Sequence, residues 1–178
     1  MDAAPNSDLA VLEWLAARGI LKPDWALAAT AKAGDTALMA WCAGKGASNF
    51  NWAMTEAAEG GQIEALAWCA RKGATLFDRA MACAAGCGHL EAMRWCAAAG
   101  HFSRGHRAFT DALRWAVTND SNEAAELCLS WGGDINAPGI SKTAWVKAVR
   151  AGGIVVEPQD PPEVFALHDP LGGFRFYD

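Results

Sequence analysis

The chain has 178 residues, a net charge of −5 at pH 7 and a hydrophobic fraction of 52%, with nine Trp and much Ala. This composition is too apolar for a disordered chain, and the length suits one domain or one short repeat array. The acidic charge, without a basic block, argues against nucleic acid as a partner. No apolar run approaches the roughly 20 residues that a membrane-spanning helix needs.

The N-terminus has no basic stretch followed by a long apolar core, so the sequence predicts no secretory signal. We therefore expect a cytoplasmic, reducing environment, in which the cysteines are free thiols packed as small hydrophobic side chains. The six are Cys42, Cys69, Cys83, Cys87, Cys96 and Cys128.

Four sets of residues recur along the chain with a step of 27 residues. They are Trp14, Trp41, Trp68 and Trp95; Trp25, Trp52 and Arg79; Asp24, Asn51 and Asp78; and Ser7, Gly34, Gly61 and Gly88. Four sets in one register predict a repeated structural unit. The recurrent Trp set, together with the neighbouring Cys residues, is interpreted as packing between units.

Each unit is predicted to hold two helices. Asp24, Asn51 and Asp78 are predicted to N-cap the first helix, because their side-chain oxygens can accept the unpaired N–H groups of a first turn. Glycine ends that helix, and a second helix follows at once, as in residues 89–99, where apolar residues fall at helical spacing. Downstream, the step grows, so an insertion before Trp115 is expected to lengthen the fourth first helix or its preceding loop.

The two ends of the chain differ from the central units. Residues 8–18 align with the second helix at 35–45, without a first helix before them, which is interpreted as a natural cap or as a sign of a fragment. Residues 143–151 read as a first helix. The predicted domains are a repeat domain at 7–156 and a Pro-rich arm at 157–178, which either packs over the last repeat or is a flexible tail.

The segment 87–93, Cys-Gly-His-Leu-Glu-Ala-Met, resembles the Gly-His-x-Glu step between the helices of an ankyrin repeat, and 127–139 resembles an ankyrin second helix with its hairpin loop. Over residues 7–156 the chain resembles the ankyrin repeat family, and its short units are similar to the Trp-rich ankyrin-like repeats of giant DNA viruses. The resemblance implies an all-α solenoid of about four to five helix–turn–helix repeats with an irregular C-terminal arm. It also implies that the start of each first helix borders a concave groove.

A row of aromatic and basic residues recurs at the start of the predicted first helices. Its composition is typical of interface hot spots, although the rings equally suit packing against one another to seal short loops. The candidate protein-binding residues are Pro23, Trp25, Phe50, Trp52, Phe77, Arg79, Arg104 and Arg107.

No catalytic constellation stands out. Cys83 and Cys87 could share a helix face beside His89, but the equivalent positions one unit earlier hold Glu56 and Gly60, so a metal site is not predicted. His101 and His106 lack a nucleophile or carboxylate evidently placed beside them. We therefore expect neither catalysis nor a cofactor.

The predicted function is non-catalytic binding of a partner protein of unknown identity, by a chain that is monomeric or weakly self-associating. By resemblance, the site of action is the cytoplasm, which would be the host cytoplasm for a viral protein. The alternative is a structural component that assembles through its open terminal repeats.

Overall fold

The computed structural model describes residues 7–140 and 143–163, and every regular element in these ranges is an α-helix. The helices are α1 (Ser7–Ala17), α2 (Pro23–Ala33), α3 (Thr36–Gly44), α4 (Phe50–Glu59), α5 (Ile63–Arg71), α6 (Phe77–Cys87), α7 (Leu90–Ala99), α8 (Arg107–Thr118), α9 (Asn122–Ser130) and α10 (Ala144–Arg150). The all-α prediction is confirmed.

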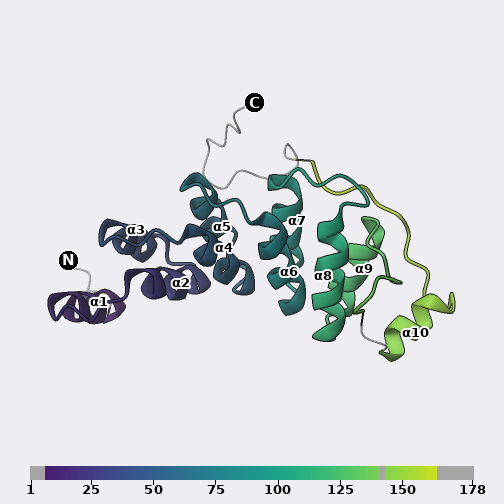
Figure 1. Ribbon diagram of the computed structural model, residues 1–178, viewed down its shortest axis with the longest axis horizontal. Coiled ribbons are helices and arrows are strands. Elements are labelled where there is room, and N and C mark those ends of the chain that lie inside the picture. Colours follow the sequence, from purple (N-terminus) through teal and green to yellow (C-terminus); the bar gives the residue numbers. More distant parts are fainter. Residues whose placement is uncertain (1–6, 141–142, 164–178) are drawn as a thin grey trace, which may run out of the picture.

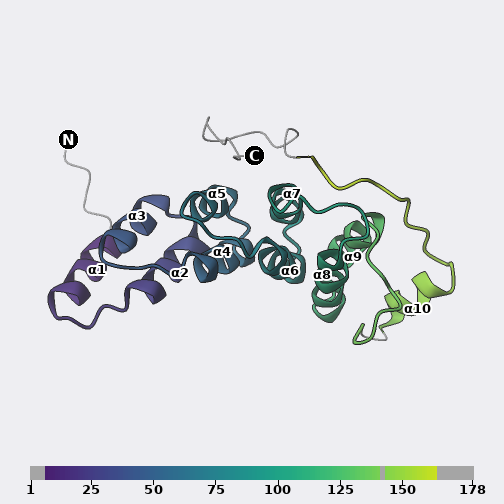
Figure 2. The same ribbon diagram turned by 45° about the horizontal axis from the view of Figure 1, so that its top comes forward.

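The helices follow one another in a row, with α1 at one end and α10 at the other (Figure 1). Helices α2, α4, α6 and α8, called the first helices below, pack directly on one another. Each second helix (α3, α5, α7 or α9) packs most extensively on the first helix of its own pair, which gives two layers (Figure 2). The first-helix layer therefore holds the row together.

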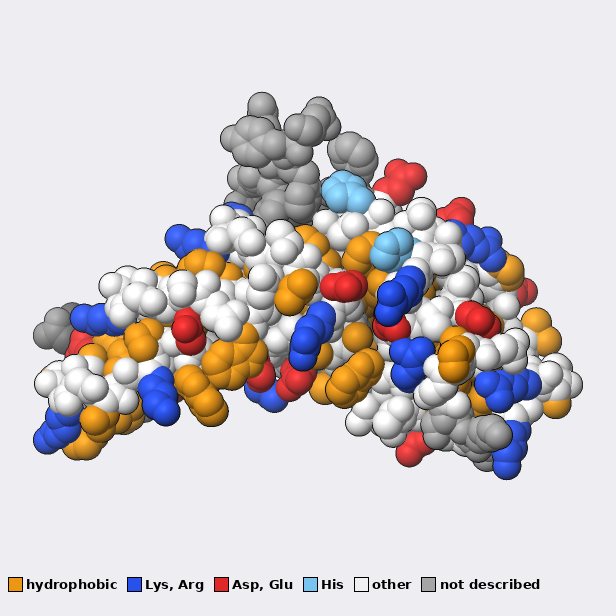
Figure 3. Space-filling model, in the orientation of Figure 1, with side chains coloured by type: hydrophobic (Ala, Val, Ile, Leu, Met, Phe, Trp, Pro, Cys, Tyr) orange, Lys and Arg blue, Asp and Glu red, His pale blue; other side chains and the backbone are white. Residues whose placement is uncertain are grey.

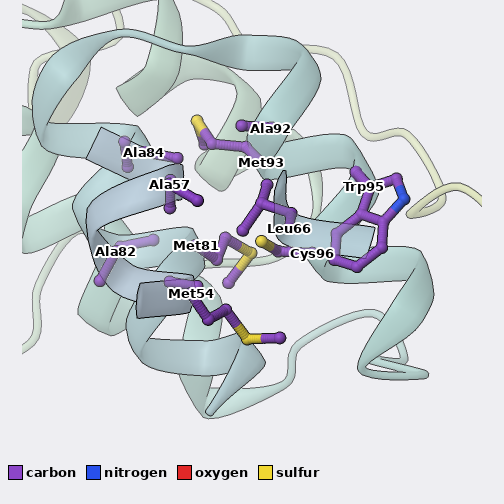
Figure 4. Close-up of a cluster of buried hydrophobic side chains, with 14 of the residues drawn as sticks. Met54, Ala57, Leu66, Met81, Ala82, Ala84, Ala92, Met93, Trp95 and Cys96 are labelled. Carbon is purple, nitrogen blue, oxygen red and sulfur yellow. The ribbon is translucent and has the colours of Figure 1, made fainter. Parts of the chain in front are cut away.

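Small residues make this close packing possible. Each first helix buries a Leu or Met side chain among alanines, and these side chains are Leu27, Met54, Met81 and Leu113. Second-helix residues such as Leu66 and Met93 complete a continuous core (Figure 4). At Gly60, an added Cβ would lie 2.2 Å from the carbonyl oxygen of Lys32, so neighbouring first helices approach too closely there for a larger residue.

The buried Trp residues pack within a helix pair. The ring of Trp68 meets that of Phe50 with centroids 5.8 Å apart, and Trp95 meets Phe77 at 6.1 Å. Trp14, at the end of the row, is 51% exposed. Trp68 and Trp95 are buried, as a packing role requires, but their aromatic partners come from the first helix of the same pair and not from a neighbouring unit as predicted.

The predicted N-caps Asp24 and Asn51 are wrong. Helices α2 and α4 start earlier than expected, with Lys22 and Asn49 at the N-cap, so Asp24 and Asn51 lie inside the first turn. In α4 the side chain of Asn49 caps the helix by accepting the N–H of Trp52 at 3.1 Å. The cap of α6 is Leu76, which places Asp78 in the same position of its helix.

Asp24 and Asn51 instead bind the linker of the following pair. Asp24 Oδ1 accepts the backbone N–H groups of Ser48 and Asn49 at 2.8 and 2.9 Å. Asn51 Oδ1 accepts those of Thr75 and Leu76 at 2.8 and 3.2 Å. We call these contacts the linker bonds, because each one joins a first helix to the linker that leads into the next first helix.

The insertion lengthens the loop at residues 100–106, and α8 is only slightly longer than α6. The loop interrupts the linker bonds, because Asp78 Oδ1 accepts the N–H of its own neighbour Arg79. The pattern resumes at Thr110, whose Oγ1 accepts the N–H of Asp134 at 3.0 Å with the same separation of 24 residues.

The predicted helix at 143–151 is confirmed, and Thr143 caps it by accepting the N–H of Val146. The following segment runs back from α10 toward α9 (Figure 1), where the N–H of Gln159 donates to Ser130 O at 2.9 Å. Residues 164–178 of the predicted arm lie outside the described residues. Within the described part of the chain, no helix combines the length and the hydropathy needed to cross a bilayer.

Candidate protein-binding face

The first helices share one side that faces away from the second helices. We call it the first-helix face. In Figure 3 hydrophobic, acidic and basic side chains alternate along the lower side of the molecule, where Figure 1 places α2, α4, α6 and α8. The face is formed by Trp25 and Lys32 of α2, Trp52, Glu56 and Glu59 of α4, Arg79 and Cys83 of α6, and Asp111 and Trp115 of α8.

An aromatic pair lies at the N-terminal end of this face. The rings of Trp25 and Trp52 meet edge to face, with centroids 5.4 Å apart and an interplanar angle of 88°. Trp52 is held in place because its Nε1–H donates to Glu56 Oε1 at 3.1 Å. Trp25 keeps 66% of its surface exposed and is therefore available for contact with another molecule.

A charged group follows the aromatic pair. Lys32 Nζ lies 2.8 Å from Glu59 Oε2 and 3.6 Å from Glu56 Oε2, so one cation bridges two helices. The hydrogen bond to Glu59, followed by the charges of Glu59 and Glu56, raises the pKa of Lys32 above its ordinary 10.5. The contacts of Lys32 and Trp52 with Glu56 therefore hold these charged side chains next to the Trp pair.

The structure divides the predicted site residues into two groups. Trp25, Trp52 and Arg79 lie on the first-helix face. Phe50 and Phe77 are half-buried and pack on the second-helix Trp residues, and Pro23 occupies the equivalent first position of α2. For Phe50 and Phe77 this geometry favours the packing interpretation.

Arg104 and Arg107 belong to the inserted loop and to the first position of α8. Both are exposed, and Arg107 Nε lies 3.4 Å from Asp111 Oδ2. Since the linker bond fixes Thr110 as the equivalent of Asn51, the residues equivalent to Phe77 and Arg79 are Phe109 and Asp111. Phe109 is fully buried, with its ring 5.2 Å from that of Trp131.

Trp115 was missed by the sequence analysis. It is 54% exposed, and its ring lies beside Gly86, where an added Cβ would be 3.6 Å from Trp115 Cε3. The sequence does indicate its position, because the 32-residue step that relates Gly88 to Asp120 also relates Cys83, in α6, to Trp115. Exposed Trp side chains thus lie on both α2 and α8.

His89 and His106 are held in the fold by contacts with backbone atoms. Residues 7–140 and 143–163 contain no cluster of three or more His, Cys, Asp or Glu side chains suited to a metal ion. His106 caps α8 by accepting the N–H of Ala108 at 3.2 Å, and His89 Nε2 lies 2.9 Å from Glu59 O. These two imidazoles therefore have structural partners.

The cysteines are free thiols, as predicted. Cys42, Cys69, Cys96 and Cys128 are buried, Cys83 is half-buried and Cys87 is exposed. Burial raises the pKa of Cys69 to about 12 and that of Cys83 to about 11. A raised pKa keeps a thiol protonated near neutral pH, which disfavours a nucleophilic role for these two.

A comparison of the chain with protein-family models finds no match, and a comparison with curated proteins finds none either.

Proposed function

We propose that the chain is an ankyrin-like solenoid of about four to five repeats that binds a partner protein through the first-helix face. The observation that carries this proposal is the exposure of Trp25, at 66%, beside the ordered ring of Trp52. Exposed Trp and Arg side chains on a rigid scaffold are the residues that most often dominate binding energy at protein interfaces.

The composition of the face also supports this function over catalysis. Trp25 and Trp115 supply apolar area at separate points, and Arg79, Asp111 and the Lys32–Glu59 pair supply charged groups between them. Such a surface matches a partner with apolar side chains that fit beside the Trp rings and with charges of both signs. The proposed site of action is the cytoplasm, and for a viral protein the host cytoplasm.

The experiment is selection of binding peptides from a random 16-residue display library on the immobilised full chain. The dissociation constant of each selected peptide is then measured for wild type, Arg79→Ala and Trp115→Ala. We expect each variant to weaken binding about tenfold or more, because loss of a hot-spot side chain costs at least about 1.4 kcal/mol.

Trp14→Ala is the matched control, because Trp14 is similarly exposed, at 51%, but lies on α1, outside the first-helix face. Selected peptides that bind wild type and both face variants equally, with equal helicity by circular dichroism, would contradict the proposal. A selected peptide lost only with Trp14→Ala would move the site to α1.

Self-assembly is the second candidate, favoured by apolar exposure at the α1 end, where Val11 and Ile20 are 57% and 56% exposed. Analytical ultracentrifugation over a hundredfold range of concentration tests it. A mass that stays monomeric throughout would exclude it.

A further inference from the structure

A pocket lies between α1 and α2 at the end of the row. It has a volume of about 350 Å³ and is lined by Leu12, Leu15, Ile20, Leu21, Lys22 and Trp25, among others. Trp25 borders both this pocket and the first-helix face, but the other lining residues belong to α1, to α2 or to the linker between them.

The pocket opens because α1 is a second helix without a first helix packed on it among the described residues. Residues of α1 and its linker are far more exposed than their equivalents in the following pairs. Val11 is 57% exposed, whereas the equivalent Leu38 and Ala65 are 6% and 0% exposed. Ile20 is 56% exposed, whereas the equivalent Ala47 is 4% exposed. The surface that a first helix covers in later pairs is therefore open here.

The backbone of the α1–α2 linker also differs from the later linkers in its hydrogen bonds. Leu21 and Lys22 are the equivalents of Ser48 and Asn49, whose N–H groups are bound by Asp24. Within residues 7–140 and 143–163, neither the N–H of Leu21 nor that of Lys22 has a hydrogen-bond acceptor. The missing acceptor is a side-chain oxygen at the second position of a first helix.

From these observations we infer that the α1–α2 pocket is a docking site for an amphipathic helix of a partner protein that takes the place of a first helix. The helix carries Asp or Asn at its second position, to bind the N–H groups of Leu21 and Lys22. It carries small residues and one Leu or Met two to four positions later, to cover Val11 and Leu12, as Met54 follows Asn51 in α4.

Charge complementarity favours such a helix. Arg18 and Lys22 are exposed at the rim, next to the place where the helix would begin, and the first turns of α2 and α6 carry Asp24 and Asp78. An acidic first turn is stabilised both by these cations and by the helix dipole. At the opposite end of the row, α10 carries the exposed cations Lys147 and Arg150 in its last turn.

The probe is a synthetic peptide that copies residues 47–61 of this chain, which form α4 with its cap. Titration calorimetry and ¹⁵N-resolved spectra of the full chain measure its binding. We expect saturable 1:1 binding with downfield shifts of the Leu21 and Lys22 amide protons. Removal of the oxygen by Asn51→Ala in the peptide should weaken binding at least fivefold, because the shared acceptor of two backbone donors is lost.

Two protein variants separate this site from the first-helix face. Val11→Arg should abolish peptide binding, and Trp115→Ala should leave it unchanged. No saturation at 1 mM peptide, or equal peptide binding by wild type and Val11→Arg, would overturn the proposal. Neither result would contradict the proposed function of the first-helix face. Two other results would also overturn the docking proposal, because they assign the pocket to another occupant. One is tighter binding only after residues 1–6 are removed, and the other is a dimer that Val11→Arg dissociates but the peptide does not.

Discussion

Asn51 and Thr75 are joined by a hydrogen bond of 2.8 Å between a side-chain oxygen on α4 and a backbone N–H in the linker before α6. The bond connects one helix pair to the next through the backbone, so it orders the linker independently of the identity of its side chains. Asp24 makes the same contact with Ser48 one pair earlier.

Asn51→Ala is therefore expected to lower the free energy of unfolding by about 1–2 kcal/mol, because two backbone donors lose their acceptor. Urea denaturation followed by circular dichroism measures the change. Asp78→Ala is the matched control, since Asp78 Oδ1 accepts the N–H of its own neighbour Arg79 and should cost about 0.5 kcal/mol. Equal losses for both variants would show that the linker bonds contribute nothing specific.

Gly60→Ala should destabilise the chain by about 1–3 kcal/mol, because the new methyl group would meet the backbone of α2 at Lys32 O, which cannot move away alone. Gly44→Ala, at the end of α3, has open space around the added Cβ and should be neutral or stabilising by up to about 1 kcal/mol. Thermal unfolding of the two variants gives the comparison. A stable Gly60→Ala variant would mean that α2 and α4 are not so closely packed.

Leu38→Ala should cost about 2–4 kcal/mol, since Leu38 is 6% exposed and leaves a cavity. Val11→Ala, at the equivalent position of α1, should change stability by no more than about 0.5 kcal/mol, because Val11 is already largely in water. Denaturant titration of both variants measures the difference. A large loss at Val11 would indicate that the α1 surface is covered in solution.

Alkaline pH should weaken the fold through Cys69. Its pKa is about 12 in the folded chain against an ordinary 9.0, so the folded state keeps a proton that the unfolded state releases. The free energy of unfolding does not depend on this thiol below pH 9. Between pH 9 and 12 the unfolded state loses the proton and the folded state keeps it, so the free energy of unfolding falls by about 1.4 kcal/mol per pH unit. Cys69→Ala should flatten this slope by about that amount in urea titrations at pH 8, 9.5 and 10.5, and an unchanged slope would contradict the assignment.

The helical fold could be predicted from the sequence because its signals are local. Small residues at helical spacing and glycines such as Gly34 and Gly88, which end α2 and α6 in the left-handed conformation, mark each helix within a few residues. The helix starts could not be placed as well. Asn49 and Asn51 are both good N-caps by residue type, and only the contact with Thr75 and Leu76, 24 and 25 residues away, distinguishes their roles.

The candidate face was predicted in part for a related reason. Trp25 and Trp52 recur at the regular step and were identified, whereas Trp115 lies beyond the inserted loop, where counting by 27 residues leads to Arg104 and the vicinity of Arg107. Phe50 recurs at the regular step as well, but the step alone does not say which side of a helix faces the core. That difference depends on the position of α5, whose Trp68 covers Phe50.

The linker bonds also make the length of the row adjustable. If residues 50–76 were deleted, Asn49 would be followed by Phe77, and Asp24 would keep its bond to Ser48, 24 residues away, which is also the separation of Asn51 and Thr75. Duplication of the same segment would preserve every such bond in the same way. A chain built on this rule can gain or lose a whole unit in one genetic event and still keep its linker bonds, and it thereby changes the number of side chains that it presents to a partner.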